Sequence, residues 1–164
     1  MFKRKTIALL QIFFLLTGSL PSLALDQTES ISSPLLITEV LFNPVSSPEA
    51  GYEWFELYNL DPDDLEYPFI LIDDGETTDI IEDLFIPAYS FILIAASEQI
   101  FLEFPDLDPD LIYFVPDGRI GNQLANSSDE IYLYDHEANL LAEISWTKDT
   151  GNGYSLELSL IHIS

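Results

Sequence analysis

The sequence predicts an all-β fold, an antiparallel sandwich or barrel, on three observations. Short runs rich in Ile, Leu, Phe and Tyr recur at intervals of roughly ten to twenty residues. Turn-forming Pro, Gly, Asn and Asp residues separate the runs. No stretch alternates long helices with strands, which argues against a parallel α/β enzyme fold. The 164 residues, 48% of them hydrophobic, suffice for one domain with a proper core and leave no room for a second.

Eight runs carry the strand pattern. In chain order the expected strands are LLITEVLFN (35–43), EWFELYN (53–59), FILID (69–73), IIEDLFI (80–86), SFILIAA (90–96), LIYFV (111–115), EIYLYD (130–135) and LLAEISW (140–146). The one helical segment is SEQIFLEF, Ser97 to Phe104. Ser97 can cap its first turn, and Pro105 blocks its extension.

Residues 1–24 have the layout of a secretory signal peptide. Lys3, Arg4 and Lys5 precede an apolar run, 6–16, and a small-residue pattern ends at Ala24, where cleavage is expected. The run is too short to span a bilayer, which needs about 20 residues. The sequence therefore predicts an exported protein, secreted or at the cell surface, with no transmembrane segment in its mature chain.

The rest of the chain divides into three parts. Residues 25–34 are polar, end in proline and are expected to be a flexible linker. Residues 35–157 form the predicted domain. Residues 158–164, LSLIHIS, match the translation of CTGTCTCTTATACACATCT, a transposon end used in preparing sequencing libraries, so we expect them to be an artefact and the native chain to continue past Glu157.

Charge and cysteine content exclude several classes of function. The chain has no cysteine, which removes disulfides, thiol nucleophiles and thiolate metal sites. Beyond residue 24, two basic residues, Arg119 and Lys148, stand against all 29 acidic ones. Such a surface repels nucleic acid and anionic membranes. The acidity itself fits either solubility in a saline habitat or cation binding.

Two glutamates, Glu53 and Glu56, lie among aromatic residues in GYEWFELYN. In a strand they point to opposite faces, so they cannot serve as the two facing carboxyls of a glycosidase. Glu56 shares its face with Trp54 and Tyr58. If that face is buried, Glu56 needs a hydrogen-bonding partner or a cation, and Arg119 and Lys148 are the basic candidates.

An ordered set of segments resembles the lamin tail domain in its bacterial exported form. The segments are LLITEVLFNP, GYEWFELYN, LIDDG, IPAYSFILIA, LANSSDEIYLYDHEANLLAEISW and GNGYSLE, which together cover about residues 35–157. The resemblance implies an immunoglobulin-like β-sandwich without catalytic residues of its own. The positions that match the family motif are Glu39, Asn43, Pro44, Glu53, Trp54, Glu56, Asn59, Asp73, Leu124, Asp129, Leu133 and Gly153.

The chain departs from this family pattern at two places. Pro68-Phe69 stands where the family has Gly-Trp before the third strand. Asn139 stands where Gly often ends the late hairpin, and asparagine tolerates the left-handed conformation that such a turn needs.

Metal and nucleophile chemistry have weak support. His136 lies in a turn and is the only histidine before the tail, so it can form neither a paired-histidine site nor a triad. Asp106, Asp108 and Asp110 fall at alternate positions and Asp117 is twelfth, as calcium-loop ligands can be. Leu111 stands where an EF-hand needs Gly, which rejects that motif but leaves an adventitious calcium site open there or on Asp61, Asp63 and Asp64.

The sequence therefore predicts a non-catalytic extracellular binding or structural module without a cofactor, calcium excepted. Its expected partners are a protein or a cell-surface polymer, reached through loops or an exposed sheet edge. The alternative is the N-terminal accessory domain of a secreted hydrolase, a nuclease or phosphoesterase, whose catalytic part lies beyond Glu157.

Overall fold

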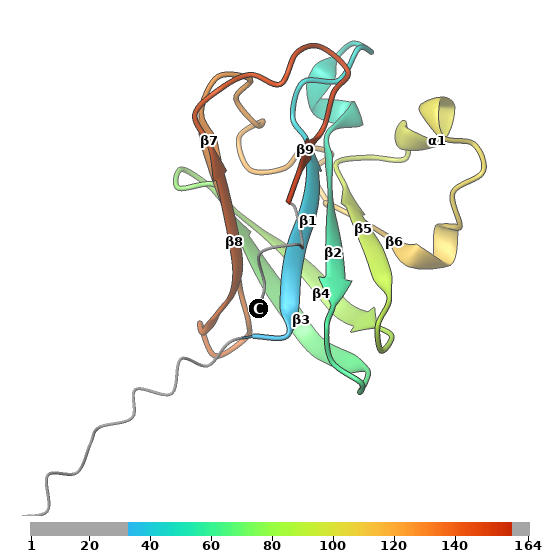
Figure 1. The fold of residues 1–164 in the computed structure, drawn as a ribbon, viewed down its shortest axis with the longest axis vertical. Helices are drawn as coiled ribbons and strands as arrows, with labels where there is room; N and C mark the ends of the chain where they lie inside the picture. The colour runs from blue at the N-terminus through green and yellow to red at the C-terminus, as the bar shows by residue number, and fades with distance from the viewer. Residues whose placement is uncertain (1–32, 159–164) are drawn as a thin grey trace, which may run out of the picture. The chain divides into compact units, whose positions relative to one another are not determined.

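The computed structural model describes residues 33–158, so the predicted signal peptide and residues 159–164 of the tail lie outside it. Two β-sheets build the described part of the chain (Figure 1). One has five strands in the order β6-β5-β2-β1-β9, and the other has four in the order β4-β3-β7-β8. The strands are β1 (Leu35–Leu41), β2 (Trp54–Asn59), β3 (Leu65–Asp73), β4 (Thr78–Ile86), β5 (Phe91–Ala95), β6 (Ile112–Phe114), β7 (Asp129–Tyr134), β8 (Leu140–Trp146) and β9 (Leu156–Glu157).

All eight predicted runs form strands, which confirms the all-β prediction. Apolar side chains of both sheets meet in one core, so the domain is a sandwich. Three details differ from the sequence prediction. β9 is an additional strand, β3 begins at Leu65, and β6 runs parallel to β5 at the sheet edge. The parallel pair arises because the chain crosses from β5 to β6 through two short helices and returns in the same direction.

Strand β2 shows how the sequence pattern becomes a sandwich layer. Phe55 and Leu57 are fully buried between the sheets, while Glu56 and Tyr58 are half-buried on the outer face. This confirms the predicted alternation of faces. Elsewhere in the core Phe42 stacks on Trp146, with ring centroids 4.5 Å apart. The largest fully buried side chains are Phe42, Phe55, Leu35, Ile37, Leu57, Ile70, Ile72, Leu84, Ile86, Ile94, Ile100 and Ile120.

The departure from the family pattern at Pro68 is absorbed inside β3. Tyr67 pairs with Leu84 and Phe69 pairs with Glu82, which leaves Pro68 opposite Asp83. Asp83 has a positive φ of 51°. Proline brings no N–H to the ladder, so an irregular position on the partner strand lets β3 continue through it.

The predicted helical segment forms a shorter helix than expected. α1 covers Ile100–Glu103, and a 3-10 turn, η2, covers Pro109–Leu111. The expected cap by Ser97 is not formed, because α1 begins later and its N-cap residue is Gln99. The hydroxyl of Ser97 accepts a hydrogen bond from the N–H of Gln99 at 3.2 Å and donates to the carbonyl of Gly51 at 2.7 Å. None of the helices within 33–158 is long and apolar enough to cross a membrane. A further 3-10 turn, η1, covers Glu49–Tyr52.

Asn59 connects two of the four places where the chain changes sheet, between β2 and β3 and between β4 and β5. Its side-chain amide donates to the carbonyls of Asp63 at 2.9 Å, Ile86 at 3.2 Å and Pro87 at 3.1 Å. Its Oδ1 accepts from the N–H of Asp61 at 2.8 Å. Asn59 is fully buried, and so is its bond to the Ile86 carbonyl, so there it satisfies a backbone group that water cannot reach.

Acidic side chains hold the crossover between β6 and β7. Four of its backbone N–H groups each donate to an acidic side chain outside the crossover. The pairs are Gly121 to Asp79 at 2.7 Å, Asn122 to Asp74 at 2.7 Å, Leu124 to Glu53 at 3.2 Å and Ala125 to Asp129 at 2.7 Å. Part of the chain's acidity is therefore structural.

Candidate functional site

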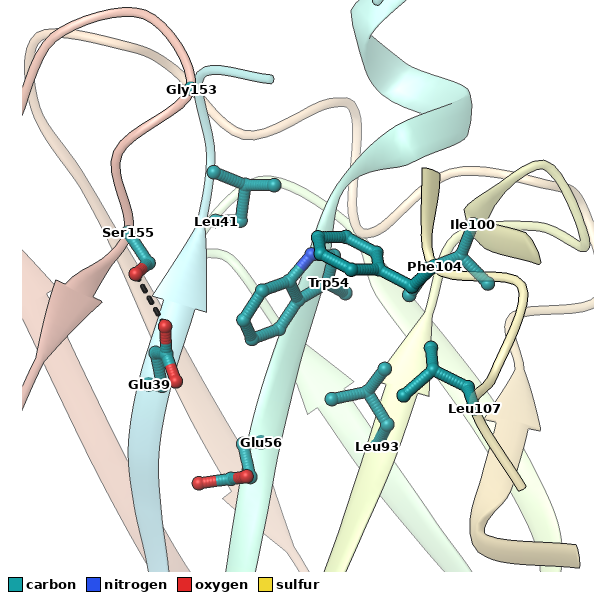
Figure 2. A pocket seen from close by; sticks show the side chains of 10 residues that line it. All are labelled: Glu39, Leu41, Trp54, Glu56, Leu93, Ile100, Phe104, Leu107, Gly153 and Ser155. Carbon is teal, nitrogen blue, oxygen red and sulfur yellow. Dashed lines mark hydrogen bonds between the residues drawn. The ribbon is translucent and has the colours of Figure 1, made fainter. Parts of the chain in front are cut away.

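A groove lies on the outer face of the five-stranded sheet, over β1, β2 and β5 (Figure 2). Its volume is about 410 Å³, within the range of small-ligand sites, which is about 300 to 1,000 Å³. We call it the outer groove. Its lining consists of Glu39, Leu41, Trp54, Glu56, Leu93, Ile100, Phe104, Leu107, Gly153 and Ser155. Four of these ten, Glu39, Trp54, Glu56 and Gly153, belong to the motif that the sequence singled out.

Two glutamates form the acidic end of the outer groove. Glu39 and Glu56 are partners on the neighbouring strands β1 and β2, so their side chains leave the sheet on the same face. The strand pairing shifts between Ile37 and Glu39, which leaves Thr38 without a partner on β2. The Thr38 hydroxyl donates to Glu56 Oε1 at 2.6 Å. This irregularity supplies the hydrogen-bonding partner that Glu56 was expected to need.

The predicted basic partners of Glu56 are not used. Across residues 33–158 the ion pair present joins Arg119 to Asp117 at 3.9 Å, on the exposed surface. Neither Arg119 nor Lys148 lies within ion-pair distance of Glu56. Burial raises the pKa of Glu56, the Thr38 hydroxyl opposes that rise, and the charges of Glu39 and Glu157 add to it.

Glu157 extends the acidic end across a third strand. Glu157 on β9 pairs with Glu39 on β1, which in turn pairs with Glu56 on β2. The three carboxylates therefore form a row across three adjacent strands. Like charges placed side by side repel, so this row is an unfavourable arrangement for the chain on its own.

Apolar side chains form the other end of the outer groove. Trp54 rises from β2, and Phe104, just after α1, meets it edge-on with ring centroids 6.4 Å apart (Figure 2). Trp54 is 9% exposed, and its indole N–H has no acceptor in the described part of the chain. Phe104 is 42% exposed, so part of this apolar surface is open to solvent.

A tight loop before β9 forms the rim next to Glu39. Gly153 has a φ of 82° and donates its N–H to the carbonyl of Asn43 at 2.7 Å. A Cβ at this position would lie 2.5 Å from Cγ2 of Val45, so the approach requires glycine. The loop places the Ser155 hydroxyl where it donates to the Glu39 carboxylate (Figure 2).

Glu53 lies on the opposite side of β2 from the outer groove. It is 0% exposed, its Oε2 accepts from the Leu124 N–H, and its Oε1 has no partner within residues 33–158. Burial raises the pKa of Glu53 to about 8; the Leu124 N–H lowers it, while Glu49 and Asp129 raise it further. Glu53 is therefore more deeply buried than Glu56, the acid for which the sequence predicted a need for a partner.

The remaining motif residues have structural positions. Asn43 donates its side-chain N–H to Asp149 at 3.0 Å, and Asp73 accepts from the N–H of Gly75 at 2.7 Å. Asn59 and Asp129 make the contacts described above. Pro44, Leu124 and Leu133 are buried.

Asp74 is a structural residue that the motif did not include. It is 5% exposed. Burial acts to raise the pKa of Asp74, but hydrogen bonds from the backbone N–H groups of Thr77, Asn122 and Glu76 outweigh it and hold that pKa below its usual value. Asn122 lies 48 positions further along the chain, so no local sequence signal marks the contact.

Two of the predicted calcium-loop aspartates accept hydrogen bonds from backbone N–H groups close by in the chain. Asp108 accepts from the N–H of Asp110 at 3.0 Å, and Asp117 accepts from that of Arg119 at 3.1 Å. Asp106, like these three aspartates, is exposed. Among residues 33–158, no group of three or more acidic or histidine side chains is arranged to hold a metal ion.

The other weak candidates also occupy surface positions. Asp61 accepts from the N–H of Asp63 at 3.1 Å, and Asp64 accepts from that of Ala88 at 2.8 Å. His136 is exposed in its turn, with its ring 6.2 Å from that of Phe69. The sequence expectation of an exposed turn histidine is confirmed.

Comparison with known proteins adds no relative to these observations. No protein-family model matches the chain, and no curated protein matches it.

Proposed function

We propose that this chain is a non-catalytic extracellular binding or structural module of the lamin tail domain type, with an immunoglobulin-like sandwich, whose partner is a protein or a surface polymer. The ordered motifs from Glu39 to Gly153 and the leader pattern in residues 1–24 support this proposal. The two-sheet architecture is compatible with it. The observation that carries the proposal is the outer groove, an apolar hollow on the sheet face of a strongly acidic domain.

The arrangement of carboxylates supports binding over catalysis. Glu53 and Glu56, the acids of the central motif, lie on opposite faces of β2. Glu39 and Glu56 do face the same groove, and each accepts a hydrogen bond from a hydroxyl of its own chain. These bonds hold the two carboxyl groups side by side on one face of the groove, which suits a site that binds a basic side chain.

The first experiment asks whether the chain is an enzyme. The purified chain and an E39Q/E56Q variant are assayed with chromogenic glycosides, esters and phosphodiesters. The proposal predicts no turnover by either protein, as does the alternative of an accessory domain cut from a hydrolase. Turnover that the wild type shows and E39Q/E56Q lacks would contradict the proposal.

The second experiment asks whether the outer groove side of the domain makes contacts. A photo-cross-linking residue replaces Phe104, which lines the groove and is 42% exposed, and in a matched variant it replaces Leu140, which is 46% exposed on β8 of the other sheet. With secreted proteins or cell-wall polymer from the source cells, the proposal predicts saturable cross-linking from position 104 only. Equal cross-linking from both positions would count against it.

A further inference from the structure

The outer groove combines three features, and each of them constrains its ligand. Glu39, Glu56 and Glu157 form a row of like charges across three strands. The two basic residues of the described part, Arg119 and Lys148, make no ion pair with this row. A positive charge brought by a ligand would relieve a repulsion that the chain leaves uncompensated.

The apolar end supplies the second constraint. Trp54, Phe104 and Leu107 line this end. An apolar ligand side chain placed here leaves water along with these protein side chains, which is favourable by roughly 25 cal/mol per Å² of buried apolar surface. Aromatic rings also attract cations that lie against their faces.

The indole of Trp54 supplies the third constraint. Its ring is nine-tenths buried at the floor of the groove, and its N–H has no acceptor within residues 33–158. A buried N–H donor without an acceptor costs about 1 to 3 kcal/mol. In Figure 2 the indole nitrogen lies on the side toward Phe104, a partly exposed residue at the rim. A ligand carbonyl can accept this hydrogen bond only if its binding displaces the Phe104 side chain.

Trp54 and Glu56 are two positions apart on β2, so their side chains leave the sheet on one face about 7 Å apart, and this spacing indicates the kind of ligand. The acids lie at one end of the groove and the Trp54, Phe104 and Leu107 side chains at the other (Figure 2). In an extended polypeptide, side chains two positions apart leave the same face about 7 Å apart. A segment with an apolar residue and a basic residue at positions i and i+2 reaches both ends and offers backbone carbonyls to Trp54.

We propose that the outer groove binds an extended segment of a partner protein in which basic and apolar side chains alternate at positions i and i+2. The inference rests on the proposed function, because it names the chemical class of the partner. Nucleic acids and anionic membranes do not fit, since the row of glutamates repels both.

The test uses the purified chain and fluorescein-labelled peptides at 0.15 M salt. The probe is Gly-Ser-Leu-Ser-Lys-Ser-Leu-Ser-Lys-Ser-Gly. One control peptide has Glu in place of each Lys, and a second has Ser in place of each Leu. Binding is followed by fluorescence anisotropy, and we expect the probe to bind with a Kd below about 1 mM and each control peptide about tenfold more weakly or not at all.

Matched variants locate the binding. E39Q/E56Q removes two charges from the groove, and E66Q/E82Q removes two from exposed positions on β3 and β4 of the other sheet. We expect E39Q/E56Q to weaken probe binding about fivefold to tenfold and E66Q/E82Q less than about twofold. Trp54→Phe keeps the apolar ring and removes the N–H, and we expect a loss of about fivefold. Thermal melting of every variant establishes that it is folded.

Three results would overturn the inference: no binding of the probe by the folded wild type, equal binding of the acidic peptide, or equal losses in E39Q/E56Q and E66Q/E82Q. None of these results would contradict the broader proposal that the chain is a binding module. That proposal fails on turnover lost in E39Q/E56Q, so the two failures are distinguishable.

Discussion

Glu53 Oε2 accepts a hydrogen bond of 3.2 Å from the backbone N–H of Leu124, 71 positions later in the chain. The contact joins the start of β2 to the crossover that leads into β7. Because Glu53 is fully buried and its Oε1 has no partner in the described part of the chain, its carboxyl group is held mainly in the neutral form, with a pKa of about 8. One side chain thus links folding to pH.

Glu53→Gln tests this link. In the wild type the pKa of the Glu53 carboxyl group rises from 4.5 to about 8 on folding. At pH values between these two, the folded state therefore holds a proton that the unfolded state has lost. The free energy of unfolding therefore falls as pH rises from about 5 to 8. In E53Q this fall is smaller than in the wild type by on the order of 3 kcal/mol between pH 5 and pH 9. Urea unfolding at several pH values measures it.

Glu66→Gln is the control for that experiment. Glu66 is exposed on β3, so this variant removes one negative charge without touching a buried carboxyl group. We expect it to keep the pH dependence of the wild type. If E53Q and E66Q have the same pH dependence, Glu53 is not the titrating group.

Asn59→Ala is expected to destabilise the domain by about 2 to 4 kcal/mol. The substitution removes four hydrogen bonds and leaves the buried carbonyl of Ile86 without its side-chain donor. Asn152→Ala, at an exposed turn, is the control and is expected to change stability by less than about 0.5 kcal/mol. Chemical denaturation of both variants measures the difference, and a loss at Asn59 no larger than that at Asn152 would refute the role of Asn59.

Gly121 and Gly118 offer a matched pair for the crossover after β6. Both have positive φ, 58° and 84°, so alanine strains the backbone at either position by about 1 to 2 kcal/mol. A Cβ at Gly121 would also lie 1.9 Å from Oδ2 of Asp74, whereas one at Gly118 meets nothing within 4 Å. We therefore expect Gly121→Ala to lower the melting temperature clearly more than Gly118→Ala. Equal losses would show that Asp74 does not fix the crossover.

Local patterns in the sequence predicted the strands and the faces of β2, because alternation of side chains is a property of the strand itself. They could not predict that Leu124 would meet Glu53, or Asn122 meet Asp74, since these contacts depend on how distant segments come together. The outer groove was missed for the same reason. The groove depends on the shift in strand pairing at Thr38 and on the contact between Phe104 and Trp54. Neither feature can be predicted from one short segment of the sequence.

The calcium candidates lead to a simple expectation. Asp108 and Asp117 are each turned to a nearby backbone N–H, and residues 33–158 show no cluster of acids arranged for a metal. Millimolar Ca²⁺ is therefore expected to leave the melting midpoint where equal ionic strength of Mg²⁺ leaves it. A ligand that favours the folded state raises apparent stability, so a rise specific to Ca²⁺ would establish a site that the structure does not predict.

The two tryptophans of the chain provide the most direct test of the outer groove. The indole N–H of Trp146 donates to the carbonyl of Ala125 at 2.9 Å, whereas that of Trp54 has no acceptor within residues 33–158 and lies at the floor of the groove. The ¹⁵N-labelled chain is titrated with the basic and apolar peptide while both indole N–H resonances are followed by NMR. We predict that the Trp54 resonance moves and that of Trp146 stays in place. Saturable peptide binding that leaves the Trp54 resonance unmoved would contradict the account.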